Sequence, residues 1–322
     1  MVLASSPEVN LANLIINRNS LQPGFDIKKL LSTYADLRFG EIPNDVDGIS
    51  INLKPTQGRP IVFISSKIPE VRQKFTMAHE LGHIVIPWHI GTIVSHTNEN
   101  HAYANRLYHD CEIEANRFAA ELLMPSEWVE SIISKKQPSS AFEIVRETAG
   151  TSHLSTFYKI CSMLPIEYIG ILTDLQEKVI SSKSNNPRLK EPKSANPIRE
   201  QAVFKSASEV ESSSFSQNKI FWLKYNLDKV MPTNEDIRDW RKIIYPIIKE
   251  LKFDNKIISR ISGCLAYLNK PNVMHEEFFQ RAQQRISSDN TFFEISQHPE
   301  FNLFLVKKID ALIKNRKNNT LF

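Results

Sequence analysis

A short histidine–glutamate motif between two prolines constrains this chain more than any other feature. The motif, His-Glu-Leu-Gly-His at residues 79–83, lies in an apolar stretch that follows Pro69 and precedes Pro87. Proline is tolerated in the first turn of a helix but breaks a helix interior, so the stretch between the two prolines predicts one helix. Residues four apart share a helix face. The imidazoles of His79 and His83 are therefore expected to point toward one place.

Two histidines at this spacing can bind one zinc ion, and the glutamate between them then has a separate task. Zinc lowers the pKa of a bound water from about 15.7 to about 7, and a neighbouring carboxylate can accept the proton. We expect His79 and His83 to be metal ligands and Glu80 to be the catalytic base. The apolar residues around the motif predict a buried helix. Burial of these polar side chains is costly unless they are paired, which favours a metal site.

A catalytic zinc ion takes three protein ligands and a water, so a third ligand is expected elsewhere. Residues 110–124 show strong helical periodicity and stop at Pro125. In helical register Glu112 and Asn116 lie on one face, and small alanines nearby would allow close approach to the motif helix. Glu112 is the preferred third ligand, with Asn116 orienting a ligand from behind. Glu114 points elsewhere on the helix and ranks second.

Four further histidines between the two helices are rival ligands of the metal. They lie in a predicted polar loop, and we expect them on the surface rather than at the metal: His89, His96, His101 and His109.

The rest of the first half predicts an α+β domain. Residues 49–53 alternate apolar and polar side chains, and Pro60 to Ile64 form a second short run rich in branched residues. Both patterns are typical of strands and predict a small antiparallel sheet before the motif helix. We expect residues 60–64 to be an exposed edge strand. Further helices are expected at 26–34, 126–134, 139–149 and 152–163.

The second half predicts a connector followed by helices. Residues 181–217 are polar and rich in proline and serine, which is typical of a linker. Several segments with helical periodicity follow. We therefore expect a metallopeptidase-like domain at 1–175, a linker at 176–217 and a helical C-terminal domain of unassigned role at 218–322.

Amino-acid composition limits the expected cellular location and the expected binding partners. The three cysteines are widely spaced, and no apolar run reaches the eighteen or so residues of a membrane helix. With no secretory leader evident at the start, these features predict a cytoplasmic protein without a membrane partner. Lys and Arg number 15 against 19 Asp and Glu in residues 1–175, and 25 against 17 in residues 176–322. The basic residues are interspersed with acids, so a solvated surface is preferred to a nucleic-acid site.

Two blocks of sequence resemble the ImmA/IrrE-type metallopeptidases of bacteria and their mobile elements. The first block runs from Arg72 to His83 and reads RQKFTMAHELGH, and the second runs from Glu112 to Pro125 and reads EIEANRFAAELLMP. Weaker similarity extends over residues 25–175. The resemblance implies a zincin core in which His79, His83 and Glu112 bind zinc and Glu80 is the base. It also implies protein substrates, commonly helix-turn-helix repressors that control stress genes or excision of a mobile element.

Residues 181–322 resemble no known family, so the substrate and the activating signal stay open. Residues 152–159 could be read as a recognition helix, but packing against the core is the preferred interpretation. Two other functions compete with an endopeptidase. One is a non-catalytic regulatory protein on a zincin scaffold, and the other is a defence or toxin effector whose C-terminal domain senses a signal. Retention of Glu80 favours catalysis, because a scaffold has no need of a general base.

Overall fold

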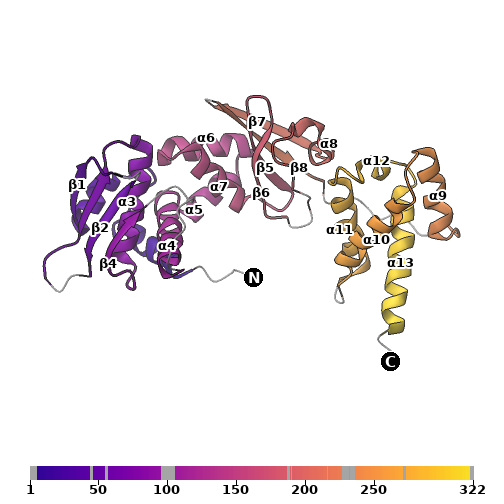
Figure 1. Ribbon diagram of the computed structural model, residues 1–322, viewed down its shortest axis with the longest axis horizontal. Helices are drawn as coiled ribbons and strands as arrows, with labels where there is room; N and C mark the ends of the chain where they lie inside the picture. Colours follow the sequence, from indigo (N-terminus) through magenta and orange to yellow (C-terminus); the bar gives the residue numbers. More distant parts are fainter. Residues whose placement is uncertain are drawn as a thin grey trace. The chain divides into compact units, whose positions relative to one another are not determined.

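The computed structural model describes residues 6–43, 46–54, 57–95, 106–186, 189, 191–215, 217–226, 232, 236–270 and 273–319. The chain divides into two compact units, a first unit at residues 1–163 and a second unit at residues 164–322 (Figure 1). The expected α+β class is confirmed: both units contain helices and a four-stranded sheet. No helix among the described residues is both long enough and apolar enough to span a membrane.

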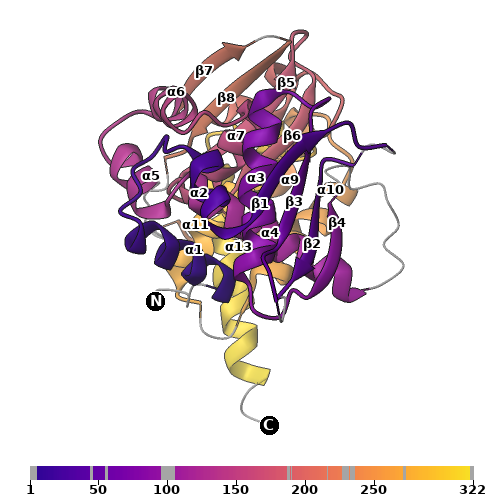
Figure 2. The same cartoon turned by 90° about the vertical axis from the view of Figure 1, so that its left-hand side faces the viewer.

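The first unit packs helices against one small mixed sheet (Figure 2). Its elements are α1 (Pro7–Arg18), α2 (Ile27–Tyr34), β1 (Asp36–Gly40), β2 (Gly48–Leu53), β3 (Ile61–Ser65), α3 (Glu70–Val85), β4 (Gly91–Ser95), α4 (Arg106–Leu123), α5 (Ser126–Ile133), α6 (Pro138–Ala149) and α7 (His153–Met163). The motif helix is α3, which packs against β2 and β3 on one side and against α4 on another.

The strand order, β1-β3-β2-β4, corrects one expectation. The run expected to be an exposed edge is β3, which pairs with β1 in parallel and with β2 in antiparallel orientation. The short strand β1 covers that edge because it follows α2 directly and continues the sheet. The two outer strands are therefore β1 and β4, and β4 is antiparallel to β2.

Helix α7 packs by one face, as its sequence favoured. Thr156, Phe157, Ile160 and Cys161 are buried, and Phe157 and Ile160 belong to the apolar core.

Helices α3 and α4 pack closely against each other at Gly82. A Cβ placed there would lie 3.1 Å from Cδ1 of Phe118 and 3.3 Å from Cα of Ala115. Such contacts are tighter than ordinary van der Waals packing, and one of them is to backbone. Glycine at this motif position therefore sets the spacing between the two helices.

The second unit contains a sheet where a linker was expected. Its elements are β5 (Tyr168–Asp174), β6 (Val179–Ser184), a short 3₁₀ turn (Ile198–Glu200), α8 (Ala202–Lys205), β7 (Glu209–Phe215), β8 (Asn218–Lys224), α9 (Trp240–Glu250), α10 (Lys256–Leu268), α11 (His275–Ser287), α12 (Phe293–Ser296) and α13 (Phe301–Asn319). The strands are antiparallel in the order β6-β5-β8-β7. The structure thus differs from the expected linker at 176–217, which supplies β6, α8 and β7.

The serine-rich composition of that stretch has a structural reason. Strands β6 and β7 are the two outer strands of the sheet, and each pairs with only one neighbour. The central strands, β5 and β8, carry the apolar residues that form a core, including Ile171 and Phe221. Outer strands can therefore be polar while the sheet stays intact. Their polar composition alone had predicted a linker without secondary structure.

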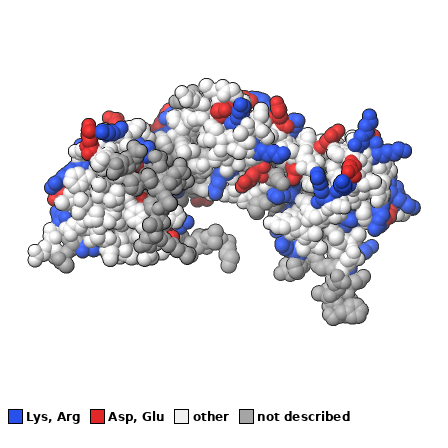
Figure 3. Space-filling model, viewed as in Figure 1, with Lys and Arg blue, Asp and Glu red and all other residues white. Residues whose placement is uncertain are grey.

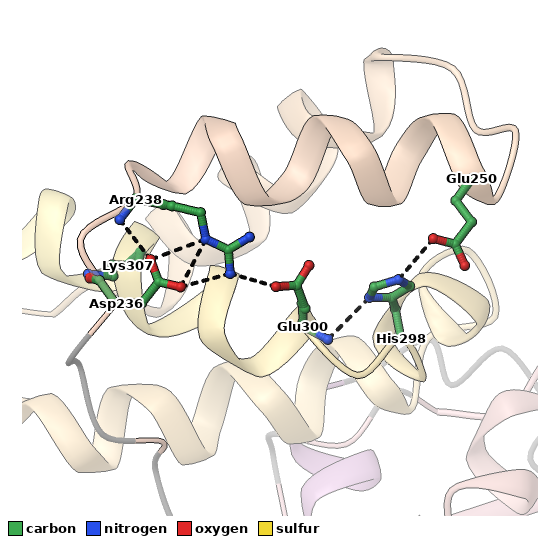
Figure 4. Close-up of polar contacts among 6 residues, drawn as sticks. All are labelled: Asp236, Arg238, Glu250, His298, Glu300 and Lys307. Atoms are coloured by element: carbon green, nitrogen blue, oxygen red, sulfur yellow. Dashed lines mark hydrogen bonds and ion pairs between the residues drawn. The ribbon is translucent and has the colours of Figure 1, made fainter.

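Helices α9 to α13 have a core of their own, built from isoleucine, leucine and phenylalanine side chains. Polar contacts join the start of α9 to α13: Arg238 bonds both Asp236 and Glu300, and Lys307 donates to the backbone carbonyl of Asp236 (Figure 4). On the face seen in Figure 3, basic side chains are interspersed with acidic ones.

Substitution of Gly82 by valine should destabilise the first unit. The added methyl groups would meet Phe118 and the backbone of Ala115, and overpacking of this kind costs about 1–3 kcal/mol. The midpoint of thermal unfolding, followed by circular dichroism, should fall.

Gly40→Val is the matched control in the same unit. A Cβ at Gly40, the last residue of β1, would meet nothing within 4 Å, and valine suits a strand. An equal loss of stability in the two variants would show that helix spacing is not the cause.

Candidate metal centre

Three side chains from α3 and α4 converge in the first unit. The Nε2 atoms of His79 and His83 lie 2.9 Å apart. Oε2 of Glu112 lies 3.4 Å from Nε2 of His79, and Oε1 of Glu112 lies 3.2 Å from Nε2 of His83. All three side chains are buried, and each offers a ligand atom within 4.8 Å of the others. The structure thus brings together the two motif histidines and the acid preferred as third ligand.

The chemistry of this cluster fits a metal ion. Burial lowers the pKa of His83 to about 3, so its imidazole is neutral and Nε2 can offer a lone pair. Burial would raise the pKa of Glu112, but hydrogen bonding to His79 and His83 outweighs it and lowers that pKa to about 2. Two imidazoles and one carboxylate are a donor set of catalytic zinc sites.

Asn116 fixes the orientation of His79. Its Oδ1 lies 2.9 Å from Nδ1 of His79, and since an amide oxygen can only accept, Nδ1 carries the proton. In the neutral imidazole, Nε2 of His79 is then unprotonated and directed at the cluster. The sequence predicted this supporting role for Asn116.

His83 is oriented by a second histidine. Nδ1 of His83 lies 2.9 Å from Nδ1 of His89, and Nε2 of His89 lies 2.9 Å from Oε2 of Glu114. The carboxylate of Glu114 accepts from Nε2 of His89, which leaves Nδ1 of His89 to accept from Nδ1 of His83. Nε2 of His83 is again free to bind. Nε1 of Trp88 also donates to Glu114, at 2.6 Å.

This chain of contacts corrects the expectation for His89 and agrees with the lower rank given to Glu114. His89, expected on the surface, is fully buried. Glu114, ranked second as a ligand, contacts His89 instead of the cluster. The position of Trp88-His89 directly after the helix-ending Pro87 was the available signal, because a chain that turns there stays close to His83. His109 is exposed, as expected, whereas His96 and His101 lie outside the described residues.

Glu80 is buried beside the cluster and held by the sheet. Oγ of Ser50, on β2, donates to Oε2 of Glu80 at 2.5 Å. Burial raises the pKa of Glu80 to about 6. A Cβ at Gly48, also on β2, would lie 2.5 Å from Oε1 of Glu80, so glycine makes room for this carboxylate. The sequence did not reveal Gly48 or Ser50, because neither lies in a motif.

The part of the chain that contains this cluster matches a known protein family. Residues 37–145 match the IrrE N-terminal-like domain of peptidase family M78. This part of the chain is similar to an IrrE N-terminal-like domain. The match agrees with the resemblance drawn from the two sequence blocks, and it contains α3, α4 and every residue of the cluster.

The other comparisons are less close. A solved structure of a Mycobacterium tuberculosis transcriptional regulator is similar at 10% identity and a TM-score of 0.41, over 68% of this chain and 76% of that one. No curated protein matches the chain.

Within residues 37–145, which match this family, a lysine binds the end of the motif helix. Nζ of Lys54 donates to the backbone carbonyls of His83, at 3.1 Å, and Ile84, at 2.5 Å. These are among the last carbonyls of α3, which have no partner within the helix. Lys54 therefore stabilises the helix end that carries His83.

Substitution of His89 by alanine should weaken metal binding while leaving the three cluster residues in place. Loss of a hydrogen-bond partner behind a metal-binding histidine typically lowers metal affinity about 10- to 100-fold. Zinc affinity, measured by competition with a chelator, should fall by that factor. His109→Ala is the control, since His109 is exposed on α4. Equal affinities for the wild type and His89→Ala would contradict the orienting role of His89.

Proposed function

We propose that this chain is a zinc-dependent endopeptidase that cleaves a protein substrate. The observation that carries the proposal is the convergence of His79, His83 and Glu112. Glu80 is buried next to them, on the same helix as the two histidines. The peptidase family matched by residues 37–145 supports the same reaction class. We assign His79, His83 and Glu112 as the zinc ligands and Glu80 as the catalytic base.

Each residue of the site has a separate role in the proposed reaction. His79, His83 and Glu112 would hold a zinc ion, which would lower the pKa of a bound water to about 7 and polarise the peptide carbonyl. Glu80 accepts a proton from the attacking water and delivers it to the leaving amine. Its raised pKa, about 6, suits both steps near neutral pH. Ser50 holds the carboxylate in position through its hydrogen bond to Oε2.

Strand β4 is the candidate for holding the substrate backbone. It is an outer strand of the sheet, next to β2, which carries Ser50 and Gly48. An outer strand offers backbone N–H and C=O groups to an extended peptide. Its last residue, Ser95, is buried. This assignment replaces β3, which is paired on both sides.

We further propose that the substrate is a cytoplasmic protein, and a DNA-binding repressor in particular. The support is the resemblance of the two sequence blocks to ImmA/IrrE-type peptidases. The regulatory-scaffold alternative is disfavoured by the way β2 accommodates Glu80: Gly48 leaves space for the carboxylate and Ser50 binds it. A protein that only bound a partner would need neither feature.

Metal analysis tests the ligand assignment. Purified wild type should contain about one zinc per chain, and His83→Ala should lose it, because a tetrahedral site needs all three protein ligands. Elemental analysis measures both. His109→Ala should keep its zinc. Equal zinc content in wild type and His83→Ala would reject the site.

Substitution of Glu80 by glutamine separates chemistry from metal binding. Glutamine keeps the size and a hydrogen-bonding oxygen but cannot accept the proton. Cleavage should fall about 100- to 10,000-fold, the usual contribution of general-base catalysis, and zinc content should stay at the wild-type level. The assay follows cleavage of a peptide mixture by mass spectrometry. Cleavage near the wild-type rate would exclude Glu80 as the base.

A further inference from the structure

A pocket of about 420 Å³ lies between the starts of α3 and α7 in the first unit. Four apolar residues line it: Pro69, Val71 and Phe75 at the start of α3, and Leu154 on α7. Val71 and Leu154 are 43% and 49% exposed, so the apolar lining is open to an incoming group.

One residue of the pocket lining, Phe75, lies close to the candidate metal centre along α3. Phe75 precedes His79 by four residues and therefore lies on the same helix face. The ring centroids of Phe75 and His79 are 6.5 Å apart. One side chain thus borders both the pocket and a residue of the metal cluster.

The polar groups of the lining already have partners. The Arg72 guanidinium is bonded to the buried carboxylate of Asp47 at 2.8 Å. Oγ of Ser152 accepts from the backbone N–H of Ser155 and donates to its hydroxyl, and Thr151 is hydrogen-bonded to Thr156. With these groups engaged, the lining favours an apolar occupant over a charged one.

We propose that this pocket receives a large apolar side chain of the substrate, such as Leu, Met or Phe, close to the bond that is cut. The inference rests on the proposed peptidase function and adds a substrate preference to it. The four residues from Phe75 to His79 rise about 6 Å along the axis of α3, and an extended peptide advances about 3.3 Å per residue. The apolar residue therefore lies within about two positions of the cut.

Ser155→Trp tests the pocket by filling it. Ser155 lines the pocket, lies outside the metal cluster and donates its backbone N–H to Ser152, a bond that the substitution keeps. Ser162→Trp is the matched control, since Ser162 is exposed on the same helix two turns further on and does not line the pocket. Both variants should match the wild type in circular dichroism and zinc content.

The first measurement is cleavage of a mixed peptide library, with products sequenced by mass spectrometry. Wild type and Ser162→Trp should prefer Leu, Met or Phe at one fixed position within two residues of the cut. Burial of such a side chain contributes about 1.5–3 kcal/mol, or roughly 10- to 100-fold in preference. Ser155→Trp should lose this preference and still cut peptides with Ala or Gly there. An unchanged preference in Ser155→Trp, or no apolar preference in the wild type, overturns the proposal.

A second measurement does not require cleavage. Labelled peptides bind to zinc-loaded Glu80→Gln, and fluorescence anisotropy compares a Leu peptide with its Ala counterpart. The Leu peptide should bind about tenfold or more tightly, and Ser155→Trp in the same background should remove the difference. Equal binding of the two peptides overturns the pocket assignment even if wild type cuts. A Leu preference in a protein that cuts nothing supports the pocket and rejects the peptidase. Self-association abolished by Ser155→Trp would instead assign the pocket to a second copy of the chain.

Discussion

The close approach of α3 and α4 is the contact on which the rest of the site depends. Gly82 brings the helices together against Ala115 and Phe118, and only at this spacing can Glu112 reach His79 and His83. The three groups are costly to bury separately. Helix packing therefore supplies the geometry, and a metal ion held by the three groups would make burial of all of them favourable.

Hydrogen bonds behind the cluster decide which atoms face it. Asn116 fixes the ring proton of His79 on Nδ1. The hydrogen bonds from His83 to His89 and from His89 to Glu114 fix the ring proton of His83 on Nδ1. Both histidines consequently direct Nε2 to the same point. Most of these supports come from α4, so a single helix provides a cluster carboxylate and, through Asn116 and Glu114, the orientation of both imidazoles. A shift of α4 would disturb every one of these contacts together.

The sheet contributes to the chemistry as well as to the core. Strand β2 makes room for Glu80 at Gly48 and binds it through Ser50, while β4 beside it has a free edge in the strand order of the described residues. The base, the candidate substrate strand and the apolar pocket at Phe75 are all placed by elements that pack around α3. In the proposed reaction, one helix would therefore contribute to metal binding, proton transfer and substrate choice.

The sequence by itself determined the local features: the motif helix between Pro69 and Pro87, the shared face of His79 and His83, and the preference for Glu112 over Glu114. Each follows from helical periodicity, which acts over a few residues. Only the tertiary structure decided that His89 is buried behind His83, that Gly48 and Ser50 serve Glu80, that β3 is an inner strand, and that the serine-rich stretch forms outer strands. These outcomes depend on contacts between residues far apart in the chain, such as Ser50 with Glu80, and composition and spacing do not encode which distant segments meet.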